Sequence, residues 1–139
     1  MAPRATRGPV DTGDGTTYRP GVPGKHQKSA AVAAVLDDLD HGRQPEPAVL
    51  ATAVRDLLRA LSAVAPGRAV EVRVPPYGAV QCVAGPRHTR GTPPNVVETD
   101  PLTWVAVATG RQPWHEAVAD GRINASGNRT DLSPYLPVW

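Results

Sequence analysis

Phenylalanine is absent from this 139-residue sequence, and Trp and Tyr number only three each. Alanine, valine and leucine must therefore supply most of any hydrophobic core. A single cysteine, Cys82, excludes an internal disulfide framework. No apolar run is longer than the seven residues 30–36, whereas a membrane-spanning helix needs about 20. The first 25 residues also lack the apolar stretch of a secretory signal, so we expect a soluble, cytoplasmic protein without stable membrane insertion.

The sequence also lacks a large excess of one charge sign. It has 15 Lys and Arg and 13 Asp and Glu, which gives a formal net charge of +2. Nucleic-acid binding needs a basic stripe or an aromatic stacking platform, so no nucleic-acid partner is expected. The four histidines and Cys82 show no pair at a metal-ligand spacing, and we expect no metal or other cofactor. Cys82 stands in an apolar stretch, where a thiol is unreactive. We therefore assign no catalytic residue and expect a protein that is not an enzyme.

The chain divides into a tail and one domain. Residues 1–25 hold nine Gly or Pro, carry charges of both signs and show no apolar periodicity. Such a segment buries too little surface to offset the entropy lost on ordering, so a disordered tail is predicted. Residues 26–139 are predicted to form a single domain.

Two amphipathic helices are predicted at the start of this domain. The first begins after Ser29, a suitable N-cap, and ends before Gly42; the second opens at Pro47 and ends at Pro66. Each carries one apolar stripe at helical spacing: Val32, Val35, Leu36 and Leu39 in the first, and Leu50, Val54, Leu57, Leu58 and Leu61 in the second. Two such helices lack a core of their own and need a sheet to cover.

Strand patterns supply that sheet. Residues 70–74 alternate apolar and charged side chains, which is typical of a half-buried strand. The following Pro-Pro-Tyr-Gly predicts a tight reversal, after which residues 79–83 pair back as a second strand. A Gly- and Pro-rich loop over 84–94 precedes a third extended segment at 95–99, and residues 122–126 are predicted to be the last strand.

Two helices are predicted between these last two strands. Asp100 followed by Pro101 is the clearest helix start in the chain, and Gly110 closes this helix. A shorter helix is expected over 113–121. The residues expected to face inward are Leu102, Val105 and Ala106 in the first helix, and Trp114, Ala117 and Val118 in the second.

Two groups of residues are candidates for binding. Arg87, His88 and Arg90 lie in the loop and carry the charges and donors that bind a carboxylate or phosphate. The final third of the chain instead concentrates apolar side chains, which suit an apolar ligand if they enclose a cleft. They are Trp104, Trp114, Leu132, Tyr135, Leu136 and the terminal Pro137-Val138-Trp139. Leu132 and Leu136 also predict a final short helix, which the proline at 134 weakens.

The order of elements over residues 95–137 resembles the C-terminal half of sterol-carrier-protein-like domains. It comprises the strand NVVET, an Asp-capped helix ending in Thr-Gly, a second helix ending in Asp-Gly, the strand RINAS and a Gly-Asn pair before a last apolar turn. With the loop RHTRGTPP, residues 70–137 look most similar to the short actinobacterial members called sterol carrier family proteins.

This resemblance implies an α+β fold in which helices pack on one face of a small, antiparallel-dominated sheet and enclose an apolar tunnel for a lipid or acyl chain. Such proteins carry ligands and generally do no chemistry. The resemblance places Leu102, Trp104, Val105, Leu132, Tyr135 and Leu136 nearest the tunnel, and Trp114 joins them as a candidate ligand contact. Fewer clear strands precede the Asp-capped helix than is usual in relatives, so a smaller sheet is expected.

Three functions follow as hypotheses. The first is non-catalytic binding or carriage of a lipid or other apolar small molecule in the tunnel. The second is a protein-interaction or accessory module without a ligand, suggested by the tail and by an exposed-looking C-terminus at 137–139. The third is recognition of an anionic or acyl-CoA-type head group through Arg87, His88 and Arg90.

Overall fold

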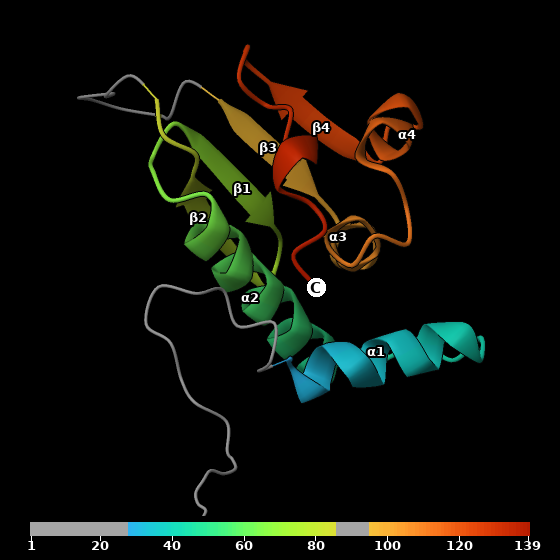
Figure 1. Cartoon of the computed structure of the whole chain (residues 1–139). Coiled ribbons are helices and arrows are strands. Elements are labelled where there is room, and N and C mark those ends of the chain that lie inside the picture. The colour runs from blue at the N-terminus through green and yellow to red at the C-terminus, as the bar shows by residue number, and fades with distance from the viewer. Residues whose placement is uncertain (1–27, 86–94) are drawn as a thin grey trace, which may run out of the picture.

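A small sheet and the helices on one of its faces form the body of the protein (Figure 1). The computed structural model describes residues 28–85 and 95–139. Within these residues the elements follow in the order α1 (Ala30–Asp40), α2 (Pro47–Val64), β1 (Val70–Val74), β2 (Gly78–Cys82), β3 (Val96–Thr99), α3 (Pro101–Ala108), α4 (Trp114–Ala119), β4 (Ile123–Ser126) and the 3₁₀ turn η1 (Ser133–Tyr135). The predicted helices and strands are present close to their expected bounds, apart from the final short helix.

The strands lie in the order β2-β1-β3-β4. β1 pairs antiparallel with β2 and parallel with β3, and β4 pairs antiparallel with β3. Val72 of β1 therefore lies between Val80 of β2 and Val97 of β3. A tight turn, closed by a 2.9 Å hydrogen bond from the Tyr77 amide to the Val74 carbonyl, suffices for the first pairing, whereas parallel strands need a long connection. The α+β fold with a small, antiparallel-dominated sheet, which the resemblance implies, is confirmed.

Apolar and charged side chains alternate along β1, and the apolar ones show which face of the sheet the helices cover. Val70, Val72 and Val74 are fully buried, whereas Glu71 and Arg73 point to the opposite face. α2 packs across β2 on the buried side, α3 lies beside α2, and α4 lies beside the edge strand β4 (Figure 1). The hydrophobic core therefore lies between this helical layer and one face of the sheet.

Two helix starts use the caps predicted from the sequence. Ser29 Oγ accepts a hydrogen bond from the Val32 amide (3.2 Å), and Asp100 Oδ2 accepts one from the Thr103 amide (3.0 Å). Each cap satisfies a backbone donor that has no partner inside its helix. The position of α3 directly after β3 is thus fixed by local chemistry.

The inward side predicted for α3 is partly wrong. Val105 is buried as predicted, but Leu102 and Ala106 are only half-buried and lie one turn apart on the outer edge of the helix. Trp104, Val107 and Ala108 are buried as well. Most sides of α3 are buried in the core. Such a helix has no polar stripe in its sequence that would mark its outer side.

Two smaller predictions near the C-terminus are also wrong. Val118 of α4 is 36% exposed and does not share the buried face of Trp114 and Ala117. The final helix shrinks to the single 3₁₀ turn η1, because Leu136 has extended backbone (φ −110°, ψ 149°). The proline that follows disfavours helical backbone at the residue before it, which explains the early end of the turn.

Two predictions fall outside the described residues. The disordered tail over 1–25 lies there entirely, and so does most of the loop over 84–94. Both remain predictions, as does the assignment of 26–139 to one domain.

Candidate functional site

The last eight residues, 132–139, run along the line where α2 and α3 meet (Figure 1). We call them the C-terminal segment, and we call their contact with the two helices the C-terminal seam. Leu132 is fully buried, and after η1 the Val138 amide donates a 2.9 Å hydrogen bond to the Ala108 carbonyl at the end of α3. Four apolar side chains of the segment are half-buried against the core: Tyr135, Leu136, Val138 and Trp139.

The wall of the seam is held together by a contact between the two helices. The Trp104 indole of α3 donates a 3.3 Å hydrogen bond to the Val54 carbonyl of α2. Trp104 is 1% exposed and Val105 is fully buried. Because a buried indole N–H needs a partner, this bond fixes how closely the two helices approach.

Six of the seven residues predicted to contact an apolar ligand belong to the hydrophobic core or pack against it. Trp104, Val105, Trp114 and Leu132 belong to the buried core cluster, and Tyr135 and Leu136 pack against it from the seam. Leu102 lies apart from them. It lines a surface cleft of about 270 Å³ together with Asp100, Thr103, Ala106 and Arg122.

A second cleft of about 350 Å³ adjoins the first and shares Asp100 and Arg122 with it. Glu98 and Asn124 supply further polar groups to its lining. Both clefts open on the outer edge of the sheet where β3 meets α3. The lining of the larger cleft is mainly polar, whereas that of the smaller one is mainly apolar, with Leu102 and Ala106 beside Asp100 and Arg122.

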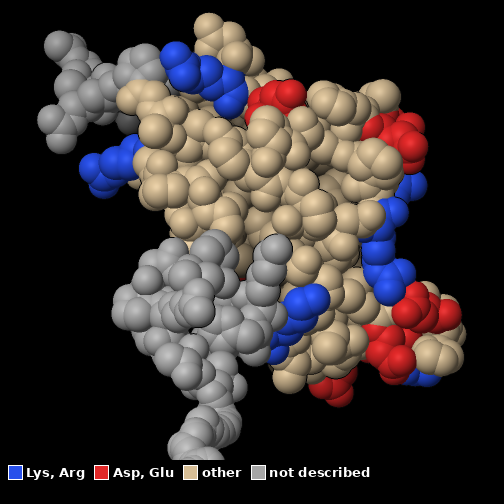
Figure 2. Space-filling model, viewed as in Figure 1, with Lys and Arg blue, Asp and Glu red and all other residues tan. Residues whose placement is uncertain are grey.

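The face that carries the seam has an uncharged centre. In Figure 2 the area over α2, η1 and α3 shows side chains other than Lys, Arg, Asp and Glu, and charged groups gather at its margins. An apolar or uncharged surface of this kind is where an apolar molecule makes first contact, because no charge must lose its hydration.

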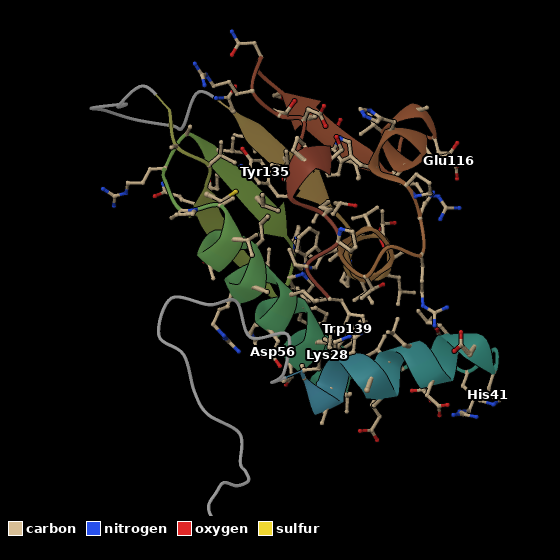
Figure 3. All side chains as sticks on the ribbon, viewed as in Figure 1. Lys28, His41, Asp56, Glu116, Tyr135 and Trp139 are labelled. Carbon is tan, nitrogen blue, oxygen red and sulfur yellow. The ribbon has the colours of Figure 1, made fainter. Side chains whose placement is uncertain are left out.

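One end of the seam meets the start of α1. Lys28 Nζ lies 4.7 Å from the centroid of the Trp139 ring, a cation–π contact, and Ser29 Oγ donates a 2.6 Å hydrogen bond to Asp56 Oδ2 of α2. Figure 3 shows Lys28, Asp56 and Trp139 close together where α1 passes α2. Sequence patterns gave no signal for these contacts, since they join positions far apart in the chain.

The expectation of an exposed C-terminus at residues 137–139 is confirmed for Pro137 but wrong for the two residues after it. Val138 and Trp139 are half-buried against the core, and Pro137 lies against Gly110, where an added Cβ would meet the ring carbons at 3.3 Å. These residues are part of the body of the protein, so an interaction module that displays them as a free peptide is not supported.

Cys82 is fully buried, as predicted, and burial raises the pKa of its thiol to about 11. A thiol with such a pKa carries almost no thiolate at neutral pH and is a poor nucleophile. Over the parts of the chain that the structure describes, no group of three or more His, Cys, Asp or Glu side chains is placed to hold a metal ion. Within the same ranges, no helix has both the length and the hydropathy needed to cross a bilayer.

Arg87, His88 and Arg90 lie outside the described residues, so the anion site they suggest stays a prediction. Its surroundings are partly visible. Arg129 Nη1 lies 3.5 Å from the position that a Cβ would take at Gly85, the second residue of the loop and the last one before its undescribed part. One further guanidinium therefore lies at the base of that loop.

A sheet covered on one face by helices and by a non-helical apolar segment is the architecture of a sterol-carrier-like α+β domain. The family model of bacterial SCP orthologs matches residues 46–138, and the chain belongs to that family. The resemblance noted in the sequence is thereby confirmed. No curated protein matches the chain.

Proposed function

We propose that this protein binds a lipid or another apolar small molecule between the helical layer and the covered face of the sheet, and carries it without chemical conversion. Membership of a sterol-carrier-like family supports this assignment of class. The unreactive state of Cys82 agrees with a protein that does no covalent chemistry. Transfer of the ligand, not its transformation, is the activity proposed.

The observation that carries the proposal is the nature of the cover at the C-terminal seam. Between α2 and α3 the core is closed by a segment with one 3₁₀ turn and otherwise no regular secondary structure. Beyond η1, its Val138 amide bonds to α3, yet four of its apolar side chains are half-buried. Such an element opens at a lower free energy than a helix packed by its whole face. When it opens, it exposes apolar surface for a guest molecule.

Six residues are proposed to line the site. Trp104, Val105, Trp114 and Leu132 form its inner wall, and Tyr135 and Leu136 form the cover that closes over the ligand. Because interiors are close-packed, binding requires the cover to move outward while the inner wall stays in place. Leu102 is left out of the lining, since it is not part of the core cluster and instead lines a surface cleft at the edge of the sheet.

Titration with dansyl-undecanoic acid, read by its fluorescence, tests this proposal. We expect saturable binding at one site, and native mass spectrometry of protein purified from cells is expected to show an adduct of lipid mass that denaturation releases. A probe that gives no saturable signal up to its solubility, together with a ligand-free mass, would overturn the proposal.

A matched pair of variants places the site. Leu136→Glu puts a carboxylate into the cover of the seam, and because a buried charge is costly it should weaken probe binding by about tenfold or more. Val118→Glu makes the same chemical change on the exposed side of α4 and should bind the probe as the unmodified protein does. Equal loss in both variants would indicate that the probe binds elsewhere.

A second candidate is recognition of an acyl ligand through its anionic head group. The loop residues Arg87, His88 and Arg90 suggest it, and the position of Arg129 at the base of the loop adds a fourth basic group. Replacing Arg87 and Arg90 by Ala should then weaken binding of an acyl-CoA more than that of an uncharged lipid. Equal weakening of both would reject this candidate.

A further inference from the structure

The helix α1 lies outside the part of the chain that the family model matches. The match begins at residue 46, whereas α1 spans Ala30–Asp40. α1 nevertheless contributes to the core, because Val32 and Val35 on its inner side are fully buried. α1 is thus an addition to the sterol-carrier-like unit that has been packed onto α2 next to the seam.

The packing of α1 is one-sided. Its buried stripe contains Val32 and Val35, with Leu36 and Leu39 half-buried, and Ala33 and Ala34 on the outer side are exposed. A helix of 11 residues is shorter than the roughly 12–15 residues at which isolated helices become even marginally stable in water. α1 therefore keeps its helical structure only while it is docked, and undocking also unfolds it.

Three polar contacts hold α1 in place, and each joins it to a different part of the body. At its start, Lys28 contacts Trp139 of the C-terminal segment and Ser29 contacts Asp56 of α2. At its end, Asp40 Oδ1 lies 2.7 Å from Arg111 Nη1, which follows α3. We call these contacts the three tethers of α1.

Two of the tethers are weakened by their surroundings, one because water reaches it and one because its carboxylate has a second partner. Asp40 and Arg111 are 51% and 39% exposed, and ion pairs in such positions are weak because water screens them. Asp56 is shared between Ser29 and Arg59 of its own helix. α1 packs extensively along α2, whereas single, partly exposed side-chain contacts join its two ends to the C-terminal segment and to Arg111.

α1 and the seam are coupled through Trp139. The side chain of this residue ends the C-terminal segment, and Lys28 lies over its ring. When α1 leaves, Trp139 loses its contact with Lys28, while the Val138 amide still bonds to Ala108.

We propose that α1 is a displaceable cover that controls access to the apolar site at the C-terminal seam. This inference rests on the proposed function for its ligand, an apolar molecule, but the movement of α1 can be tested without any ligand. The closed form is the one described here, and opening consists of the undocking of α1 and the release of the Trp139 side chain.

Hydrogen exchange of the full chain tests the movement. We expect the α1 amides to exchange at least about tenfold faster than those of α2, and the double variant Lys28→Ala/Arg111→Ala to accelerate α1 several-fold more. Arg43→Ala is the matched control, since among the described residues the Arg43 side chain pairs with Asp37 and Asp38 of α1 itself, at 2.8 and 2.9 Å. Unchanged α1 exchange in the double variant would overturn the proposal whether or not a ligand is found.

A reversible lock tests the control of access. In Ser29→Cys/Asp56→Cys a cysteine replaces each of the two side chains that touch, and the loss of two free thiols on oxidation reports the disulfide, while Cys82 stays buried. Association of dansyl-undecanoic acid should be at least about tenfold slower in the oxidised form and recover on reduction. Equal rates in the two forms would overturn the cover. If neither form nor the unmodified protein binds the probe, the proposed function fails, and the exchange experiment alone decides the movement of α1.

Discussion

The indole of Trp104 donates its hydrogen bond to the carbonyl of Val54, fifty positions earlier in the chain, across the contact of α3 with α2. The bond is between two buried groups, and it holds the wall on which the C-terminal segment rests. Trp104 therefore stabilises the proposed site by its packing. The loss of stability on its replacement shows how tightly it is packed.

We expect Trp104→Ala to lower the free energy of unfolding by about 3–5 kcal/mol, because it removes a fully buried side chain and leaves a cavity. Trp139→Ala is the comparison, and a half-buried residue at the end of the seam should cost clearly less. Urea unfolding followed by circular dichroism measures both. A Trp104→Ala variant as stable as Trp139→Ala would mean that Trp104 borders an empty space and not a packed core.

Two glycines with positive φ are expected to respond differently to alanine. Gly42 (φ +68°) ends α1 with nothing within 4 Å of an added Cβ, so its replacement should cost only about 1 kcal/mol of backbone strain. Gly67 (φ +145°) would place that Cβ 2.2 Å from the Val83 carbonyl oxygen. We expect a loss of roughly 3 kcal/mol or more there, because the backbone must move as well. Thermal unfolding of the two variants checks the order.

The docking of α1 should depend on pH in two directions. The hydrogen bond and charge of Arg111 hold the pKa of Asp40 below its usual value, so this carboxylate stabilises the folded state above about pH 4 and the effect is lost as pH falls. The backbone carbonyl and the charge of Asp37 raise the pKa of His41. Its contribution is complete below pH 6.5 and is lost as pH rises through the higher, folded-state value.

Hydrogen exchange of α1 at pH 3.5, 5.5 and 8, corrected for intrinsic rates, should therefore show the greatest protection at pH 5.5. Asp131 also has a lowered pKa, because its carboxylate accepts hydrogen bonds from Ser133, so acid affects the C-terminal segment too. Asp40→Asn isolates the α1 effect and should remove the acid-side change. A flat profile in the unmodified protein would contradict this prediction.

Cys82 should report on global unfolding. With a pKa of about 11, roughly one thiol in a thousand is ionised at pH 8, and the side chain is fully buried in addition. Iodoacetamide should therefore modify the folded protein at least about 100-fold more slowly than the urea-unfolded chain. Rapid alkylation of the native protein, measured by mass spectrometry, would show that β2 opens locally.

Much of the fold follows from short-range patterns. The alternation of apolar and charged residues over 70–74 correctly predicted the strand and its buried face. The caps Ser29 and Asp100 correctly predicted where two helices start. Such features depend on neighbours in sequence, and so a single sequence reveals them. The sterol-carrier-like assignment also came from the order of these elements.

Features that depend on distant partners could not be predicted in the same way. The alternation of β1 does not reveal that β3 pairs with it in parallel, because the side-chain period is the same for either direction. The outer edge of α3 at Leu102 was missed because core surrounds most of that helix. The tether between Lys28 and Trp139 joins the two ends of the described chain, and no local pattern signals it.

On the face of the sheet turned away from α2 and α3, Arg73 pairs with Glu71 at 2.8 Å and stands beside Glu98 of the neighbouring strand. This charged side has no share in the apolar interior, so chemical handles can be installed there without disturbing the proposed ligand site. A cysteine at the exposed Gln81, carrying a maleimide dye or a surface anchor, would allow single-molecule or immobilised assays in which the cargo-bearing side stays free.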